Sequence, residues 1–435
     1  MARRLDSRAP DFDAQFASLI TQDRETAEDV TASVRTIIAE VRARGDAALI
    51  DFSAKFDRAA LTRATLRVAE DEIAGAEAQC DAKALSALDV AAKRIEAYHR
   101  RQIPTDESFT DETGTTLGWR WTALESVGLY VPGGTASYPS SVLMNALAAR
   151  VAGVARVVMV TPATDGRINP LTLAAAKRAG VSEIYRIGGA QAIAALAFGT
   201  ETIASVDKIV GPGNAYVAAA KREVFGTVGI DSVAGPSEIL VVADARNDPE
   251  WIAADLLSQA EHDASSQSIL ITDDEAFATR VDEAVSRASV LLPRKDIVEA
   301  SWRDHGAIIV VAKIDDAARL VDRIAPEHLE LAVENPKALL AQVHHAGAVF
   351  LGRHTPEAMG DYIAGPNHVL PTARTARFSS GLSVLDFLKR TTLLHCTPGA
   401  VAALGPDAIV LAESEGLEAH ARSIAARLNR RSGDE

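Results

Sequence analysis

The stretch Val127-Gly-Leu-Tyr-Val131 is a short apolar run that leads directly into the turn residues Pro132-Gly-Gly134. Similar runs follow along the chain, and an Ala-rich segment of helical character comes after each run except the last. These later runs are Val157–Val160, Ile184–Ile187, Lys208–Val210 and Val228–Ile230. Short buried runs joined by helices are typical of βαβ units, so this region predicts a parallel β-sheet.

A second set of apolar runs lies further along the chain, again with helical segments between them. These runs are Ile239–Val242, Ser268–Ile271, Ala307–Val311 and Ala348–Leu351. We therefore expect an α/β fold with two Rossmann-like parallel-sheet halves, duplicated in architecture but without a clear residue-level repeat. The likeness is incomplete because no glycine turn has the pattern G-x-G-x-x-G. A cleft between the halves is the expected place for a site.

The segments that flank the two halves have a different character. Residues 1–25 are polar with little periodicity and are expected to form an arm that docks on other structure. Helical spacing of apolar residues covers 26–56 and 70–101, whereas alternation predicts a hairpin over 109–121. Beyond Gly381 the pattern is helical again. The expected fold therefore includes a helical N-terminal arm and a small helical C-terminal segment.

The composition favours a soluble protein of more than one domain. The chain has 435 residues, too many for a single compact core, with 48% hydrophobic and 24% charged residues. A formal net charge of −14 argues against nucleic acid and anionic membranes as partners. The two cysteines, Cys80 and Cys396, have no partner at metal or redox spacing, and no apolar stretch approaches a membrane span. We expect a cytoplasmic protein.

Glycine turns follow three of the predicted strands in the first half. They are Tyr130-Val-Pro-Gly-Gly134, Ile187-Gly-Gly-Ala-Gln191 and Gly211-Pro-Gly-Asn214. At the carboxyl ends of parallel strands, free backbone N–H groups and helix N-termini attract phosphates and nucleotides. Taken singly, each turn is equally compatible with an ordinary connection between a strand and a helix.

The second half contains a carboxylate next to an imidazole, in Pro326-Glu-His-Leu-Glu330. Glu327 and His328 are suitable groups for a general-base pair near neutral pH. Adjacent side chains point in different directions, so both reach a cleft only from an irregular, exposed position, which a Pro-Glu-His turn supplies. The alternative is a solvated polar turn, which is the commoner meaning of an isolated Glu-His.

Gln259 and His262 are three residues apart near the end of an amphipathic helix, and therefore lie on one face. An imidazole and an amide oxygen could form half of a metal site. The alternative is a helix-end histidine that complements the helix dipole. Asp361 lies in a long glycine-rich loop, and His368 in the same loop suits either a ligand or a turn contact.

In the C-terminal tail, Glu415 and His420 lie five residues apart around a glycine. Glu413 and Glu418 are rival carboxylates, and the spacing does not rank them.

Taken together, the chain resembles the histidinol dehydrogenase family over nearly its whole length. The motifs that carry the resemblance are Gly211-Pro-Gly-Asn-Ala-Tyr-Val-Ala-Ala-Ala-Lys221, Asp231-Ser-Val-Ala-Gly-Pro-Ser-Glu238, Gln259-Ala-Glu-His262, Pro326-Glu-His-Leu-Glu330, Gly360-Asp361 with Gly365-Pro-Asn-His-Val-Leu-Pro371, and Ser379-Ser-Gly-Leu-Ser-Val384. Six long motifs in the family's order make a specific match.

The resemblance implies a role for each matching residue. The implied zinc ligands are Gln259, His262, Asp361 and His420, and the implied catalytic pair is Glu327 and His328. The implied substrate contacts are these four ligands with Ser237, His328 and Glu415, and the implied nucleotide contacts are Tyr130, Gln191 and Asn214. It also implies zinc and NAD+ as cofactors, and a homodimer in which Glu415 and His420 belong to the partner's site.

The implied reaction is the oxidation of L-histidinol to L-histidine with two NAD+, through a bound histidinaldehyde. The expected division is an arm over 1–25, a zinc and catalytic domain over 26–127 with 237–380, and an NAD-binding domain over 128–236. The segment 381–435 is expected to dock on the partner subunit.

Two other functions compete with this interpretation. A related zinc- and NAD-dependent enzyme could oxidise another primary alcohol, such as a sulfonated diol, but Glu415 and Ser237 favour histidinol. A zinc hydrolase could use Glu327 to activate water, but the chain has no H-E-x-x-H cluster, and the glycine turns would then have no role. A scaffold role explains neither the acid–base pair nor the ligands.

Overall fold

The structure is a computed structural model that describes residues 2–22, 30–133, 138–233 and 235–428. Gly134 of the first glycine turn and residues 23–25 of the expected arm lie outside these ranges. The chain divides into two compact units, Met1–Gln102 with Glu125–Phe387, and Ile103–Leu124 with Leu388–Glu435. Both parallel sheets belong to the first unit.

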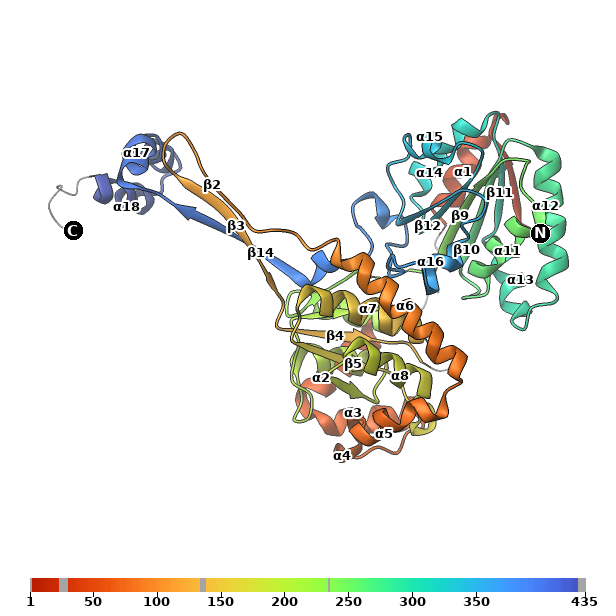
Figure 1. Ribbon diagram of the computed structural model, residues 1–435, viewed down its shortest axis with the longest axis horizontal. Coiled ribbons are helices and arrows are strands. Elements are labelled where there is room, and N and C mark those ends of the chain that lie inside the picture. Colours follow the sequence, from red (N-terminus) through yellow and green to blue (C-terminus); the bar gives the residue numbers. More distant parts are fainter. Residues whose placement is uncertain (1, 23–29, 134–137, 234, 429–435) are drawn as a thin grey trace. The chain divides into compact units, whose positions relative to one another are not determined.

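The first half of that unit is built on a five-stranded parallel sheet, in the order β6-β5-β4-β7-β8. Strands β4 and β5 of this sheet are labelled in Figure 1. Its strands are β4 (Ser126–Tyr130), β5 (Arg156–Val160), β6 (Glu183–Tyr185), β7 (Lys208–Val210) and β8 (Gly229–Ile230). Its connecting helices are α7 (Pro139–Ala152), α8 (Pro170–Ala179), α9 (Gly189–Phe198) and α10 (Ala215–Val224). Asn169 and Asn214 cap the N-termini of α8 and α10 with their side chains, which fixes where these helices begin.

The second half has a six-stranded parallel sheet in the order β1-β11-β10-β9-β12-β13. Its strands are β1 (Arg3–Asp6), β9 (Glu238–Ala243), β10 (Gln267–Thr272), β11 (Ala307–Val310), β12 (His328–Ala332) and β13 (Ala348–Leu351). Its helices are α1 (Phe12–Ile20), α11 (Pro249–Ala260), α12 (Glu275–Ser289), α13 (Lys295–Asp304), α14 (Ala317–Ile324), α15 (Pro336–Leu340) and α16 (Glu357–Tyr362). Alternate residues of β9 face two separate cores, one with α1 and α14 and the other with α11, α12 and α13. The predicted pair of parallel sheets is therefore confirmed.

Counted along the chain within each half, both sheets place their strands in the order third, second, first, fourth, fifth. Strand β1 adds an edge beside β11, because the N-terminal arm pairs in parallel with that strand. In both halves the first and fourth strands are neighbours, and the strand order reverses between them. This is the topological switch point at which α/β sheets bind ligands.

The helices that precede the first sheet pack on the first half, which differs from the expected grouping of 26–127 with 237–380. They are α2 (Thr31–Arg44), α3 (Asp46–Asp57), α4 (Arg63–Leu66), α5 (Glu70–Ala76) and α6 (Ala82–Arg100). Val34 and Val41 of α2 share a core with Tyr130 and Val158. An apolar stripe predicts that a helix packs on something, but it does not show which of two sheets the helix will cover.

The second unit contains a three-stranded antiparallel sheet in the order β14-β3-β2. Its strands are β2 (Glu107–Thr110), β3 (Thr116–Ala123) and β14 (Leu388–His395), and its helices are α17 (Pro398–Ser414) and α18 (Glu418–Leu428). The predicted hairpin is confirmed as β2 and β3. The wholly helical C-terminal segment is wrong, because Leu388–His395 pairs along the full length of β3. The partner strand lies far away in the sequence, so no local pattern indicates the pairing.

Short 3₁₀ turns complete the chain, at Glu77–Gln79, Thr164–Gly166, Ile314–Asp316, Thr375–Arg377 and Val384–Phe387. No helix among the described residues is both long enough and apolar enough to span a bilayer.

Candidate active site

Glu327 and His328 lie at the amino end of β12, beside the amino end of β9. The ring Nδ1 of His328 lies 2.9 Å from the backbone oxygen of Glu238 and 3.6 Å from Oε2 of Glu327. The same Glu327 oxygen accepts a hydrogen bond from the backbone N–H of Glu238, at 2.9 Å. Glu327 is 7% exposed and His328 is 3% exposed. The expected exposed position is therefore wrong, and so is the alternative of a solvated turn.

Burial perturbs both members of this pair. Burial raises the pKa of Glu327 to about 7, although the charge of His328 opposes the change. Burial alone would lower the pKa of His328, but the carboxylates of Glu327, Asp361 and Glu357 outweigh it and raise the pKa to about 10. Both groups therefore have proton affinities set by their neighbours, which is common for acid–base groups in active sites.

Two more carboxylates face the other ring nitrogen. Nε2 of His328 lies 3.6 Å from Oδ1 of Asp361 and 3.7 Å from Oε1 of Glu357, and it has no hydrogen-bond partner among the residues that the structure describes. One donor atom from each of the three residues lies within 4.8 Å of the others, so the group could hold a metal ion. Glu357 was not predicted from the sequence. Its position four residues before Asp361, hence on the same helix face, is the signal that could have revealed it.

Asp361 lies on helix α16, so the predicted loop position is wrong; buried polar contacts fix this helix and the loop that follows it. Oε1 of Glu330 on β12 accepts a hydrogen bond from the backbone N–H of Glu357, at 2.6 Å. Nδ1 of His368 lies 2.9 Å from the backbone oxygen of Asp361, and its Nε2 lies 3.2 Å from the hydroxyl of Ser141 on α7. Both ring nitrogens thus have polar neighbours, and the structure favours the turn contact over the ligand for His368.

Gln259 and His262 lie at the C-terminal end of α11, as the sequence predicts. Gln259 is 1% exposed, and within the described part of the chain its buried Oε1 has no hydrogen-bond partner. His262 is exposed as a whole residue, but protein atoms surround its ring and keep water away from it. This desolvation lowers the pKa of His262. Asp361 opposes the shift and His328 adds to it, so both lie close enough for their charges to act on His262. An unpaired buried oxygen at a helix C-terminus is a suitable cation ligand.

In the first sheet, the residues expected to contact the nucleotide lie toward the carboxyl ends of the strands, whereas Glu327 and His328 lie at the amino end of a strand of the second sheet. Tyr130 ends β4, and its buried hydroxyl accepts a hydrogen bond from the backbone N–H of Gly189, at 3.1 Å. Burial raises the pKa of Tyr130 to about 12. Gln191 is buried on α9, and Oδ1 of Asn214 accepts from the N–H of Val217 at 3.2 Å. Because β4 and β7 are neighbours at the strand reversal, Tyr130 and Asn214 flank the switch point.

The remaining predicted residues are distributed over both units. Ser237 directly precedes β9, and its backbone oxygen accepts a hydrogen bond from the N–H of Gln267, at 3.0 Å. It is therefore next in sequence to Glu238, which contacts the acid–base pair. Glu415 and His420 lie in the second unit, where both are exposed.

Comparison with known proteins agrees with this geometry. The family model described as histidinol dehydrogenase matches residues 20–428. The chain is 65% identical to the histidinol dehydrogenase of Rhodospirillum rubrum over 99% of both chains, and 62% identical to that of Ruegeria pomeroyi over 100% of both. The chain belongs to the histidinol dehydrogenase family. The crystal structure of histidinol dehydrogenase from Elizabethkingia anophelis matches it with a TM-score of 0.94 and 39% identity, over 98% of each chain.

Membership of the histidinol dehydrogenase family makes the chain an oxidoreductase of histidine biosynthesis. The resemblance inferred from the six sequence motifs is thereby confirmed, as is the expected α/β fold.

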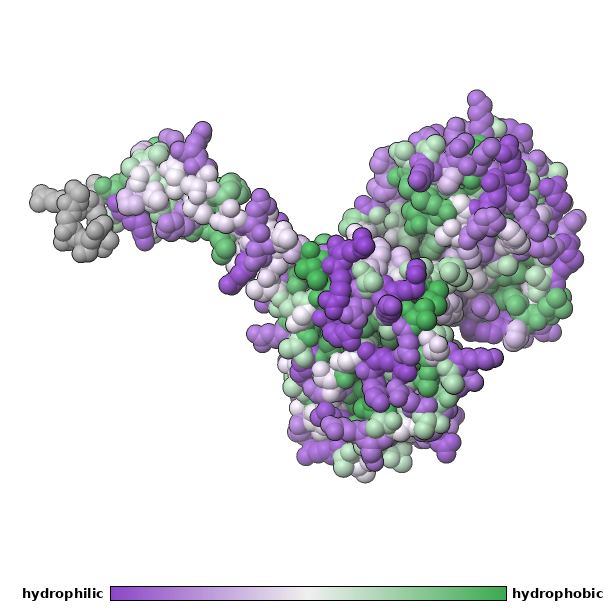
Figure 2. Space-filling model, in the orientation of Figure 1, coloured by the Kyte–Doolittle hydropathy of each residue, from purple (hydrophilic) through white to green (hydrophobic). Residues whose placement is uncertain are grey.

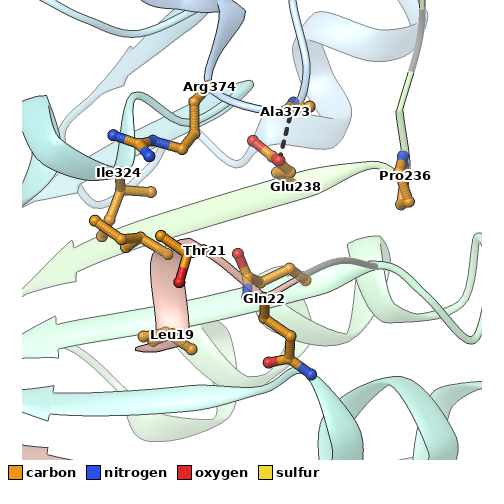
Figure 3. A pocket seen from close by; sticks show the side chains of 10 residues that line it. Leu19, Thr21, Gln22, Pro236, Glu238, Ile324, Ala373 and Arg374 are labelled. Atoms are coloured by element: carbon orange, nitrogen blue, oxygen red, sulfur yellow. Dashed lines mark hydrogen bonds between the residues drawn. The ribbon is translucent and has the colours of Figure 1, made fainter. Parts of the chain in front are cut away.

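A separate pocket of about 190 Å³ adjoins the acid–base pair of this family member. Glu238 lines it with its side chain, and one carboxylate oxygen accepts a hydrogen bond from the backbone N–H of Ala373, at 3.1 Å (Figure 3). Pro236, Gln22 and Arg374 line other sides. None of the residues that the sequence predicts for the site lines this pocket. It lies beside the acid–base pair and does not contain it.

Proposed function

We propose that the chain oxidises L-histidinol to L-histidine with two NAD+, through an L-histidinaldehyde that stays bound between the two steps. The observation that carries the proposal is the buried, unpaired Nε2 of His328, which faces the carboxylates of Asp361 and Glu357. Nδ1 of the same ring faces the carbonyl of Glu238. A neutral ring that donates from Nδ1 keeps its basic lone pair at Nε2, where the substrate hydroxyl would lie.

His328 and Glu327 divide the proton transfers between them. His328 accepts the alcohol proton in the first step and acts again as a base in the second, while NAD+ accepts the hydride each time. A cation next to Asp361 would offset the carboxylate charge that raises the pKa of His328, and so favour the basic form of the ring. Glu327, with a pKa of about 7, is matched to activating the water that attacks the aldehyde.

The residues around Asp361 fit a zinc ion. We assign Gln259, His262 and Asp361 as ligands together with the partner's His420, and the unpaired oxygen of Gln259 supports this choice. When bound by these nitrogen and oxygen donors, zinc would serve to orient the imidazole and amino nitrogens of histidinol. Glu357 is a competing donor, because one of its carboxylate oxygens lies within 4.8 Å of ligand atoms of both His328 and Asp361.

The other substrate contacts follow from the two sheet edges. Tyr130, Gln191 and Asn214 would contact NAD+, because Tyr130 and Asn214 flank the switch point of the first sheet. Ser237 and the partner's Glu415 would contact histidinol.

We also propose a homodimer that shares its sites, and the surface of the second unit supports this. Large apolar side chains there are exposed, including Leu394 at 67%, Leu411 at 64% and Val410 at 60%. Green, hydrophobic residues are visible on the surface of this unit (Figure 2). Only a few residues of α17 and α18 are buried, among them Ala400 and Ala421. Exposed apolar surface of this kind is typical of a surface that another chain covers.

The reaction is tested by the yield of NADH per histidinol consumed. We expect two NADH for each histidinol, with activity lost on chelation and restored by zinc. A yield of one, or full turnover in chelator without added metal, would contradict the proposal. The Glu327→Gln enzyme serves as the matched variant, because it should stop after the first NADH if Glu327 activates the water.

Site sharing is tested by mixing two inactive enzymes, His420→Ala and His328→Asn. In a mixed dimer with crossed tails, one site collects both defects and the other site is intact. Random reassociation should then restore roughly a quarter of the wild-type activity, since about half of the dimers are mixed and each has one good site. No recovery above the two parents would show that each tail serves its own subunit.

A further inference from the structure

A buried ion pair lies directly beneath the turn that carries Asn214. Lys221 on α10 and Asp231 at the end of β8 are in direct contact, with side chains only 3% and 5% exposed. Asp231 Oδ2 accepts a hydrogen bond from the backbone N–H of Gly211, at 2.7 Å. The Lys221 ammonium donates to the backbone oxygen of the same glycine, at 3.1 Å. One residue of the turn is thus held at both of its backbone groups.

Gly211 begins the turn that carries Asn214, and it lies against the backbone of Tyr130 at the end of β4. Its φ of 112° is a backbone conformation that residues with a side chain rarely adopt. A Cβ atom at this position would lie 2.1 Å from the backbone oxygen of Tyr130. The turn is therefore pressed against the end of β4, and the ion pair fixes the residue that makes this close approach.

We propose that Lys221 and Asp231 are positioning residues for the nucleotide, which hold the turn from Gly211 to Asn214 in the shape that receives NAD+. The proposal rests on the assignment of NAD+ to this edge. Among the described residues, the two side chains hydrogen-bond to each other and to Gly211 and to no other group. A buried ion pair contributes little net stability compared with apolar residues of similar size. Its charges are therefore better explained by the two backbone groups that they hold.

Three variants of the ion pair and one matched control separate an effect on nucleotide affinity from an effect on stability. Lys221→Met should raise the KM for NAD+ by roughly tenfold to a hundredfold, as expected for losing charge-assisted hydrogen bonds. The KM for histidinol should stay within about twofold, because the substrate contacts lie on the other sheet. Lys221→Arg keeps the charge and should recover part of the NAD+ affinity. Titration of NADH fluorescence gives the same comparison without turnover.

The double variant Lys221→Met with Asp231→Leu decides between positioning and plain structural support. Replacing both charges by apolar side chains should bring the melting temperature back to near that of the wild type. The KM for NAD+ should stay raised, because Gly211 has still lost both partners. Lys208→Met is the matched control, since Lys208 on β7 is also paired, with Asp386 at 3.2 Å, but does not touch the turn. It should leave the KM for NAD+ unchanged.

Two outcomes would overturn the inference. One is a double variant, folded and active, with the wild-type KM for NAD+. The other is an equal rise in KM for Lys208→Met, which would point to general loosening of the sheet. If the wild-type enzyme itself does not reduce NAD+ with histidinol, the proposed function fails, which is a distinct result.

Discussion

The two parallel sheets share one strand order but place their polar residues at opposite edges. In the first sheet, Tyr130 is the last residue of β4, and Asn214 follows the carboxyl end of β7. In the second sheet, Glu327 and His328 lie at the amino end of β12, next to the amino end of β9. Both pairs occupy the switch point between the first and fourth strands of their half. The same topology therefore presents different side chains at its two edges.

Helix direction explains why the two edges suit different chemistry. At the carboxyl edge, helices such as α10 begin, so free N–H groups and a positive partial charge face the ligand. At the amino edge, α11 ends, and Gln259 and His262 lie where its carbonyl groups give a negative partial charge. An anionic nucleotide suits the first edge, and a metal cation or a protonated histidine suits the second.

The largest expected effect is at the amino edge, in the variant His328→Asn. Loss of a general base typically reduces the rate by roughly 10²–10⁴-fold, and here both half-reactions should fall. The first is measured with histidinol and the second with histidinaldehyde supplied directly, each with NADH formation as the readout. A loss confined to one half-reaction would show that another residue is the base in the other step.

The next largest effect is on the pH dependence of the unfolding free energy. It distinguishes a buried carboxylate at the amino edge, Glu327, from a carboxylate on the surface. Burial raises the pKa of Glu327 from 4.5 to about 7, so the folded protein binds this proton more tightly than the unfolded chain does. The protonated Glu327 therefore adds to the free energy of unfolding. This contribution is fully present below pH 4.5 and is lost as the pH rises through 7. Over that window the loss is on the order of 3 kcal/mol.

The variant Glu327→Gln cannot lose this proton. Its unfolding free energy relative to the wild type, measured in urea with chelator, should therefore increase between pH 5 and pH 8. Glu334→Gln, at a side chain that is 56% exposed, is the control and should show no such increase. Parallel behaviour of the two variants would mean that Glu327 is not held protonated by its surroundings.

The comparison also shows what the sequence could and could not predict. Strands such as β5 and β9 are continuous apolar runs, because both of their faces are buried, and these were predicted. Strand β12 was missed because His328 and Glu330 interrupt its apolar pattern. His328 belongs to the proposed acid–base pair, so the local signal failed where the site is proposed.

The site itself was predictable mainly through the family resemblance. Spacing alone suggested Gln259 with His262, but it could not relate them to Asp361, because the position of Asp361 depends on how α16 packs against β12. Glu357 was missed for the same reason. The sheet edge at which the polar residues of each half lie also depends on the strand order, and a series of apolar runs in the sequence does not show that order.

The smallest expected effect sharpens the comparison at the carboxyl edge, with two asparagines that have the same local role. Asn214 caps α10 and Asn169 caps α8, so replacing either by alanine should cost about 1 kcal/mol of stability. Only α10 follows β7 at the switch point, whereas α8 follows β5. Asn214→Ala should therefore raise the KM for NAD+ by roughly tenfold, the loss of one hydrogen bond, while Asn169→Ala leaves it unchanged. If both variants raised it equally, the effect would come from helix capping in general, and the switch point would lose its special place in nucleotide binding.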